Sequence, residues 1–202
     1  MLAEVVAFDG EIATMLPLGT EAPAFDLVDA VSGKSFTLDS FRGKDGLVVI
    51  FLCSHCPYVK HLRDGLATFA LDYAPTKLGI VAISANDPVS HPADSPEGLA
   101  KEARAAGWSF PVLFDATQSV AKAYTAACTP DFFLFDAQRK LVYRGRFDAS
   151  RPGNPHPVTG ADLRAACDAL LARKPIARDQ KPSIGCNIKW RAGNEPEYFP
   201  PR

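Results

Sequence analysis

The stretch Leu47-Val-Val-Ile-Phe-Leu-Cys53-Ser-His-Cys56-Pro57 decides the fold of this chain. Its first six residues are all apolar, which predicts a β-strand buried on both faces of a sheet. After Pro57, apolar residues recur every three or four positions, a spacing typical of an amphipathic helix: Tyr58, Leu62, Leu66, Phe69 and Tyr73. Proline suits the first turn of such a helix, where its missing N–H costs nothing.

A second apolar run, residues 78–83, predicts another buried strand. Two strands joined by a helix form a βαβ unit and therefore pair in parallel. Before this unit, the pattern predicts a hairpin around Ser32-Gly33-Lys34. After it, the pattern predicts a helix from Ser95-Pro96-Glu97 to about Gly107, a strand at 112–114 and a helix at 119–126. Strands at 132–135 and 141–143 follow, and then a last helix that carries Leu163, Cys167, Leu170 and Leu171.

Length and composition favour one elaborated domain. The chain has 202 residues, of which 47% are hydrophobic and 22% charged, with a formal net charge of −1. We expect an N-terminal arm at 1–18, the α/β domain at 19–174, and an irregular proline-rich tail at 175–202 that packs on the domain. No basic stripe suggests a nucleic-acid or anionic membrane partner. No secretory signal or long apolar segment is evident, so we expect a cytoplasmic protein in a reducing compartment.

Five cysteines are present: Cys53, Cys56, Cys128, Cys167 and Cys186. An odd number in a chain without a leader does not indicate a disulfide framework. A C-x-x-C pair between a buried strand and a helix in a βαβ unit instead indicates thiol redox chemistry. The unpaired N–H groups at a helix N-terminus favour a thiolate. We therefore predict that Cys53 is the exposed attacking thiol and Cys56 the buried resolving thiol.

His55 lies between the two cysteines, where an imidazole can stabilise the Cys53 thiolate. The hypothesis is a pair more oxidising than ordinary thioredoxin, within the range from about −270 mV to about −120 mV. In the alternative interpretation, His55 is a solvated side chain with little influence on the sulfurs.

Three further groups could take part in the chemistry. Cys128 and Cys186 are candidates for additional redox cysteines, with packing as the alternative, whereas Cys167 lies on the apolar face of a predicted helix. Cys53 and Cys56 could also bind zinc together with His61, but no second C-x-x-C or H-x-x-H accompanies them. We therefore expect no bound metal and no bound organic cofactor.

Several segments resemble the peroxiredoxin (alkyl hydroperoxide reductase and thiol-specific antioxidant) superfamily, specifically its C-x-x-C-bearing peroxiredoxin-like branch. They span most of the chain, from Gly19-Thr-Glu-Ala-Pro-Ala-Phe-Asp-Leu through Cys53-Ser-His-Cys-Pro-Tyr-Val59, Thr129-Pro-Asp-Phe-Phe-Leu-Phe-Asp136 and Tyr143-Arg-Gly-Arg146 to Pro182-Ser-Ile-Gly-Cys-Asn-Ile-Lys-Trp190. The resemblance implies a thioredoxin-like fold, a central mixed sheet flanked by helices. It also implies a cis peptide bond at Thr129-Pro130, facing the cysteines.

Two departures from these families bear on function. Peroxidases of the superfamily carry threonine three residues before the attacking cysteine, where this chain has Ile50 before Cys53. Thioredoxins carry a buried acid six residues before the first cysteine, where this chain has Leu47. The resemblance therefore argues against an efficient peroxidase and leaves the buried thiol without its usual proton acceptor.

The sequence as a whole predicts a thiol–disulfide oxidoreductase acting on a disulfide-containing protein or small molecule. Cys53 attacks, Cys56 resolves, His55 tunes the thiols, and Thr129-Pro130 shapes the substrate cleft. Electrons would come from an external thiol of the thioredoxin or glutathione system. The alternatives are a thiol peroxidase that uses Cys53 and a non-catalytic redox-sensing or binding module. The oligomeric state is left open.

Overall fold

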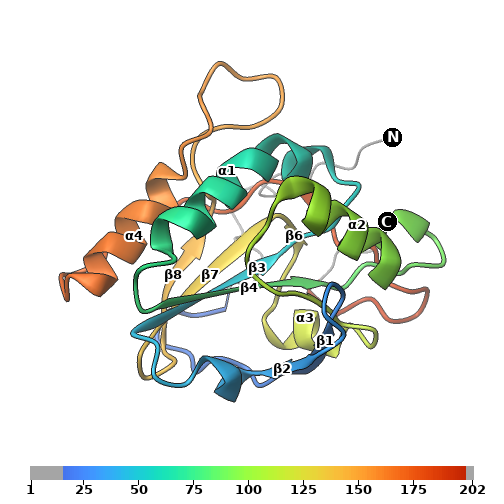
Figure 1. Ribbon diagram of the computed structural model, residues 1–202, viewed down its shortest axis with the longest axis horizontal. Helices are drawn as coiled ribbons and strands as arrows, with labels where there is room; N and C mark the ends of the chain where they lie inside the picture. Colours follow the sequence, from blue (N-terminus) through green and yellow to red (C-terminus); the bar gives the residue numbers. More distant parts are fainter. Residues whose placement is uncertain (1–15, 199–202) are drawn as a thin grey trace.

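A computed structural model describes residues 16–198. Its core is a seven-stranded mixed sheet in the order β2-β1-β5-β4-β3-β7-β8, flanked by helices on both faces (Figure 1). The predicted hairpin is confirmed, since β1 (Asp26–Asp29) pairs antiparallel with β2 (Ser35–Thr37). Most of the predicted N-terminal arm, residues 1–15, lies outside the described residues.

The central βαβ unit is also confirmed. Strand β3 (Gly46–Phe51) leads through α1 (Pro57–Tyr73) into β4 (Leu78–Ser84), and the two strands pair in parallel with Val48 opposite Ile80. All six residues of β3 are buried, as a strand covered on both faces should be.

The remaining strands extend the sheet on both sides. On one side, β5 (Val112–Phe114) pairs in parallel with β4. On the other, β7 (Asp131–Asp136) lies antiparallel to β3, and β8 (Leu141–Gly145) lies antiparallel to β7. The other helices are η1 (Leu38–Phe41), η2 (Pro92–Asp94), α2 (Pro96–Ala106), α3 (Ser119–Ala123) and α4 (Ala161–Leu171). Helix α3 ends before the predicted boundary at 126, because Thr125 has a positive φ of 51°.

Alternation along β3 divides the core into two layers. Val48 and Ile50 face the layer that contains the apolar sides of α1, α2 and α4. Leu47, Val49 and Phe51 face the other layer, with α3 and the tail residues Ile188 and Trp190. Each layer buries side chains whose truncation in a packed core typically costs about 2–5 kcal/mol. The sheet is therefore held rigidly where β3 ends and Cys53 begins.

The tail is not wholly irregular, which corrects the prediction for residues 175–202. Cys186–Asn187 forms a short strand, β9, that pairs antiparallel with β6 (Cys128–Thr129). The tail thereby returns to pair with the segment that ends in Thr129. Local composition, rich in proline and polar residues, could not reveal a pairing with residues about sixty positions away.

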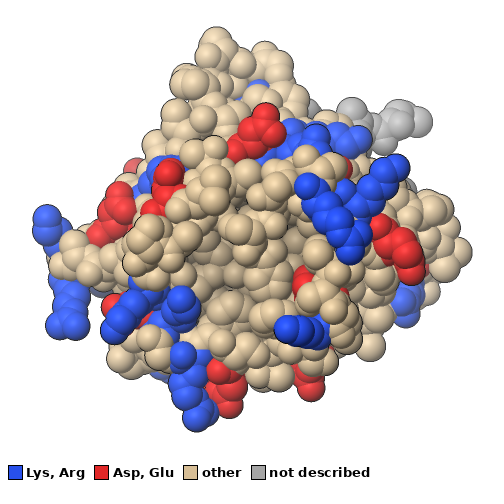
Figure 2. Space-filling view, in the orientation of Figure 1, with Lys and Arg blue, Asp and Glu red and all other residues tan. Residues whose placement is uncertain are grey.

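The surface drawn in Figure 2 carries basic and acidic side chains interspersed around a neutral centre. Within residues 16–198 no helix is both long and apolar enough to cross a membrane.

Candidate active site

The two cysteines sit where β3 passes into α1. Cys53 follows the strand by two residues, and Cys56 is the N-cap of the helix, because Pro57 occupies the first helical position. An N-cap side chain faces the unpaired N–H groups of the first turn. The helix N-terminus therefore acts on Cys56, and the prediction that it acts on the first sulfur is wrong.

Both sulfurs are buried. Cys53 and Cys56 each have 0% of their surface exposed, which contradicts the prediction of an exposed Cys53. Ser54 and Thr129 are buried around them, while the side chain of His55 is 27% exposed. The ring of His91 stacks on that of His55, with centroids 4.8 Å apart. His55 thus lies between Cys53 and the surface.

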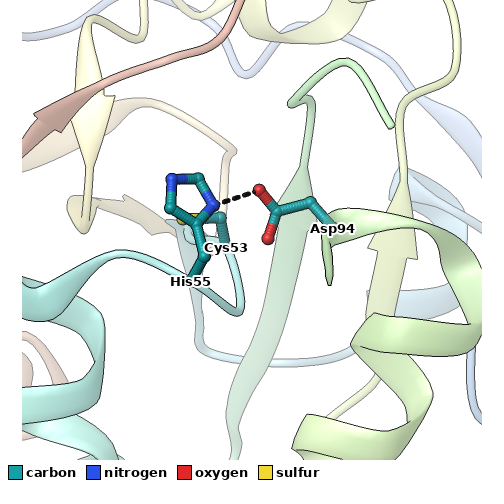
Figure 3. A group of neighbouring side chains, drawn as sticks. All are labelled: Cys53, His55 and Asp94. Atoms are coloured by element: carbon teal, nitrogen blue, oxygen red, sulfur yellow. Dashed lines mark hydrogen bonds and ion pairs between the residues drawn. The ribbon is translucent and has the colours of Figure 1, made fainter. Parts of the chain in front are cut away.

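A buried carboxylate, Asp94, organises the loop that holds Cys53. Its Oδ1 accepts hydrogen bonds from the Ser54 backbone N–H (2.8 Å) and the Ser54 hydroxyl (2.7 Å). Its Oδ2 lies 2.5 Å from Nδ1 of His55 (Figure 3). The same oxygen accepts a hydrogen bond from the Asn86 amide at 2.8 Å. Four donors therefore surround a side chain that is 0% exposed. This network fixes the orientation of the imidazole beside Cys53.

Burial raises the pKa of Asp94, but the hydrogen bonds from His55, Asn86 and Ser54 outweigh it and lower that pKa to about 2. Asp94 is thus a carboxylate at neutral pH. A carboxylate at Nδ1 sets the tautomer of an imidazole, leaving Nε2 as its proton-accepting nitrogen when the ring is neutral. Asp94 and His55 form a proton-accepting pair next to Cys53.

The loop between β4 and α2 supplies Asp94. Asp94 ends η2, and the next residue, Ser95, caps α2 by accepting a hydrogen bond from the Gly98 N–H at 3.2 Å. Gly98 permits this tight turn, since a Cβ there would lie 2.1 Å from the Ala93 carbonyl oxygen. Leu47 stands where thioredoxins carry a buried acid. In this chain the buried acid is Asp94, which comes from another segment and lies beside Cys53.

Cys53 is a poor thiolate in this setting. Its hydrogen bond to Cys56, its burial and the negative charge of Asp94 raise the pKa of the Cys53 thiol. A hydroxyl lies within reach, since Oγ1 of Thr129 is 3.3 Å from its sulfur. The direction of this shift is opposite to the sequence-based prediction.

The surroundings of Cys56 act in the opposite direction. Hydrogen bonds from the thiols of Cys186 and Cys53 lower the pKa of Cys56, and the nearby backbone N–H groups of Val59 and Cys186 add to the effect. Burial opposes the shift, because it disfavours the charged form. The sulfur also lies 3.2 Å from the Thr129 carbonyl oxygen, to which the protonated thiol donates. The surroundings therefore favour ionisation of Cys56 over that of Cys53.

The residues predicted to face the cysteines do so. The Thr129-Pro130 peptide bond is cis, and Thr129 contacts Cys53 through its hydroxyl and Cys56 through its carbonyl. Cys186, in β9, lies directly opposite Thr129. Cys128 points elsewhere, with its sulfur 3.7 Å from the Pro130 carbonyl oxygen, and Cys167 is buried in the core under α4.

One group of side chains within residues 16–198 has the composition of a metal site. Ligand atoms of Cys53, His55 and Asp94 lie within 4.8 Å of one another. This group differs from the predicted zinc candidate, because it contains neither Cys56 nor His61. His61 instead lines a cavity of about 230 Å³ with Tyr58, Pro130 and Arg151. Each of the two Asp94 oxygens already has two hydrogen-bond partners. We therefore interpret the group as a proton-transfer network.

Comparison with known proteins now assigns the family. Residues 18–144 match the AhpC/TSA family. The chain belongs to that family. It is 32% identical over 117 residues to a Mycobacterium tuberculosis protein whose name marks it as a candidate peroxiredoxin, a match that covers 56% of this chain and 66% of the relative. The chain therefore spans about two thirds of the length of this relative.

Solved structures support the fold. An uncharacterised Sinorhizobium meliloti protein is 53% identical, with a TM-score of 0.87, over 89% of this chain and 98% of that one. The thioredoxin domain of a Bacteroides vulgatus thiol-disulfide oxidoreductase aligns with a TM-score of 0.57 at 20% identity, covering 74% and 96%. The fold is thioredoxin-like, and the family indicates a thiol redox function in general.

Sequence reasoning missed three members of the site: Ser54, Asn86 and Asp94. Ser54 and Asn86 carried no distinguishing pattern. Asp94 gave one signal, its place directly before the Ser95-Pro96-Glu97 helix start, which fixes its backbone position. Nothing local indicated that the carboxylate would reach residues forty positions earlier.

Proposed function

We propose that this chain is a thiol–disulfide oxidoreductase whose Cys53 and Cys56 alternate between dithiol and disulfide. One observation carries the proposal: both sulfurs of the C-x-x-C lie against Thr129, Cys53 at 3.3 Å from its hydroxyl and Cys56 at 3.2 Å from its carbonyl oxygen. Two cysteines held on one residue between β3 and α1 are arranged to form a bond between them. His55, hydrogen-bonded to the buried Asp94, supplies a proton acceptor near Cys53.

The exchange proceeds in two steps. The Cys53 proton passes to His55, and the Cys53 sulfur attacks a substrate disulfide, expelling one substrate thiolate and leaving a mixed disulfide. The Cys56 thiolate then attacks the Cys53 sulfur, expels the second thiolate and closes the Cys53–Cys56 bond. Two electrons reach the substrate, and an external thiol of the thioredoxin or glutathione system restores the dithiol. We propose a reducing cytoplasm as the setting.

Access to Cys53 requires a movement, because its sulfur is fully buried. His55 is the partly exposed side chain over it, so rotation of the imidazole away from Asp94 opens a path. A small or extended disulfide fits such an opening better than a folded surface. The substrate class is therefore a small disulfide or a flexible cysteine-containing peptide.

A trapping experiment tests the proposal. Oxidised glutathione is added to the full chain, free thiols are blocked in acid, and the tryptic peptide 45–60, which contains both cysteines, is weighed. We expect Cys56 to be in a disulfide in the wild type, and a stable glutathione adduct on Cys53 in Cys56→Ser. The Cys53→Ser/Cys56→Ser double variant is the control and should give neither. Absence of both products from the wild type and Cys56→Ser would contradict the proposal.

A thiol peroxidase is the second candidate, favoured by Oγ1 of Thr129 lying 3.3 Å from the Cys53 sulfur. Thr129 would supply the hydroxyl that Ile50 cannot. Peroxide would oxidise Cys53 to a sulfenate with release of an alcohol or water, and Cys56 would then expel water as the disulfide forms. This candidate predicts peroxide-dependent NADPH consumption in a thioredoxin-coupled assay, lost in Thr129→Val. The raised pKa of Cys53 argues for a slow reaction.

A further inference from the structure

We propose that Cys186 is a second resolving thiol, so that the disulfide formed between Cys53 and Cys56 passes on to become Cys56–Cys186. The inference extends the proposed function and rests on it, because Cys56 must first be oxidised by Cys53. It gives the C-terminal tail a chemical role that the βαβ unit alone does not require.

The geometry brings all three cysteines to Thr129. Cys186 is paired with Thr129 across β6 and β9, and the carbonyl oxygen of Thr129 is 3.2 Å from the Cys56 sulfur, while its hydroxyl is 3.3 Å from the Cys53 sulfur. The pKa values of both Cys53 and Cys186 are raised by a hydrogen bond to Cys56, so Cys56 is the sulfur that the other two share. Thiol–disulfide exchange needs an attacking, a central and a leaving sulfur, and these three supply that order.

The tail is tied down on both sides of Cys186. Gly185 lies so close to β6 that a Cβ would be 2.1 Å from the Thr129 carbonyl oxygen. After β9, the backbone N–H of Lys189 donates to Oδ1 of Asn86 at 2.8 Å, and Ile188 is 2% exposed. Asn86 uses its amide nitrogen on Asp94, so one side chain joins the tail to the His55–Asp94 network. Cys186 is therefore held at the site.

The tail also occupies the backbone edge where a substrate strand would pair. Thr129, beside the cis-proline, is the residue whose backbone an extended substrate strand could pair with at the predicted cleft. Here that edge is paired with the chain's own Cys186. Cys186 thus takes the position of a substrate cysteine in an internal strand.

The transfer step balances as a simple exchange. The Cys186 thiolate attacks the Cys56 sulfur of the Cys53–Cys56 disulfide, the Cys56–Cys186 bond forms, and Cys53 leaves as a thiolate. The Cys186 proton passes to solvent, and the Cys53 thiolate regains a proton. No net oxidation occurs, because one disulfide replaces another. An external thiol then reduces Cys56–Cys186 by attack on the 6%-exposed Cys186.

Oxidation of Cys56 itself prepares Cys186 for attack. In the reduced protein, the hydrogen bond to Cys56, burial and the charge on Cys56 raise the pKa of the Cys186 thiol. Once Cys56 is bonded to Cys53, it carries no negative charge, so the first and third of these causes disappear. The positive charge of Lys189 remains and favours the Cys186 thiolate.

The other two cysteines provide matched controls. Alternate residues of a strand point to opposite faces, so Cys128 faces away from the side on which Thr129 and Cys186 lie. Cys128 is 3% exposed, and Cys167 is fully buried within the core. Neither lies between the reacting sulfurs.

Peptide mapping tests the relay. The full chain is oxidised with one equivalent of diamide, free thiols are blocked in acid with N-ethylmaleimide, and trypsin then separates Cys53 and Cys56 in peptide 45–60 from Cys186 in 179–189 and Cys128 in 123–139. We expect a cross-link between 45–60 and 179–189 in the wild type and in Cys128→Ser. Cys56→Ser should lose it.

The state of Cys53 gives an independent reading. After one equivalent of oxidant, wild-type Cys53 should be free and carry the blocking group, because the disulfide has moved on. Cys186→Ser should instead hold Cys53 in the internal disulfide of peptide 45–60, and Cys167→Ser should behave as the wild type.

Other outcomes would overturn the relay and show whether the Cys186 step or the Cys53–Cys56 exchange is wrong. Formation of the internal Cys53–Cys56 disulfide without any cross-link would remove Cys186 from the chemistry and leave the proposed function standing. A cross-link retained in Cys56→Ser, or one to peptide 123–139, would mean that the sulfurs meet in another order. If no disulfide forms, both the relay and the proposed function fail.

Discussion

Two segments outside the βαβ unit cover the two cysteines, and they act in opposite directions. The loop before α2 brings the carboxylate of Asp94 next to Cys53, where its charge raises the pKa of that thiol. The tail brings the thiol of Cys186 to Cys56, where its hydrogen bond lowers the pKa. The unit fixes where the sulfurs lie, and the peripheral segments decide which of them is ionised.

Because their surroundings differ, Cys53 needs a base to ionise, whereas Cys56 needs hydrogen-bond donors. A thiol beside a carboxylate needs a base to lose its proton, and His55, held by Asp94, lies there. A thiolate at a helix N-cap needs only donors, and the thiols of Cys53 and Cys186 and the backbone N–H groups of Val59 and Cys186 supply them. Breaking either segment should change one sulfur more than the other.

The largest effect is expected from Asp94→Ala. This change removes the acceptor of two Ser54 donors and of the Asn86 amide, and leaves His55 without its partner. Breaking a buried charged network of this kind costs about 3–5 kcal/mol of unfolding free energy, measurable by urea denaturation. Asp39→Ala is the control, since its ion pair with Arg42 is exposed and should leave the midpoint nearly unchanged. An equally small effect of Asp94→Ala would contradict the network.

The same carboxylate predicts a pH dependence. The pKa of Asp94 is about 2 in the folded protein, against about 3.9 for an unfolded aspartate. Its contribution to stability is therefore fully present above pH 4 and is lost as the pH falls toward 2. Wild type and Asp94→Ala differ in their free energy of unfolding, and on the order of 2 kcal/mol of that difference should be lost over this pH interval. A difference that stays constant from pH 5 to about pH 2 would contradict the assignment.

An intermediate effect is expected from Gly185→Ala in the tail. The added Cβ meets the backbone carbonyl of Thr129, which has no side-chain freedom to move aside. Overpacking of this kind costs about 1–3 kcal/mol, and here the tail can escape it by leaving β6. We expect iodoacetamide to modify Cys56 and Cys186 about tenfold faster or more, since each 1.4 kcal/mol is a factor of ten. Unchanged rates at both cysteines would show that the tail does not cover them.

The smallest effect is expected from Cys186→Ala. The lost hydrogen bond to the Cys56 thiolate should raise the apparent pKa of the reduced pair by about one unit, since a hydrogen bond to a charged group contributes about 1.5–3 kcal/mol before water replaces it. Thiolate absorbance followed against pH measures the shift. Cys186→Ser should restore the original value, because a hydroxyl also donates. Cys167→Ala serves as the control, and a shift there of similar size would refute the specific contact.

Local pattern was enough to predict the framework. The apolar run before Cys53, the helical spacing after Pro57 and the second strand fixed the parallel βαβ unit, because each of these signals lies within a few residues of the structure it forms. The position of Thr129-Pro130 opposite the cysteines came from resemblance to a family. These residues were found without knowledge of any long-range contact.

The protonation of the site could not be predicted in this way. It depends on Asp94, forty residues from Ser54, and on Cys186, paired with Thr129 from the far end of the chain. Pro57 did contain a usable signal: a proline at the first helical position makes Cys56 the N-cap, and so makes Cys56 the sulfur that faces the helix N-terminus.

A redox titration of the wild-type chain tests the central claim most directly. The protein is equilibrated in glutathione buffers, quenched in acid, and the fraction with oxidised Cys56 is read from peptides 45–60 and 179–189. Hydrogen bonds that stabilise the Cys56 thiolate stabilise the reduced protein, so we predict one reversible two-electron transition above about −270 mV. Thiols that remain reduced up to about −120 mV, or a transition at or below about −270 mV, would contradict the account.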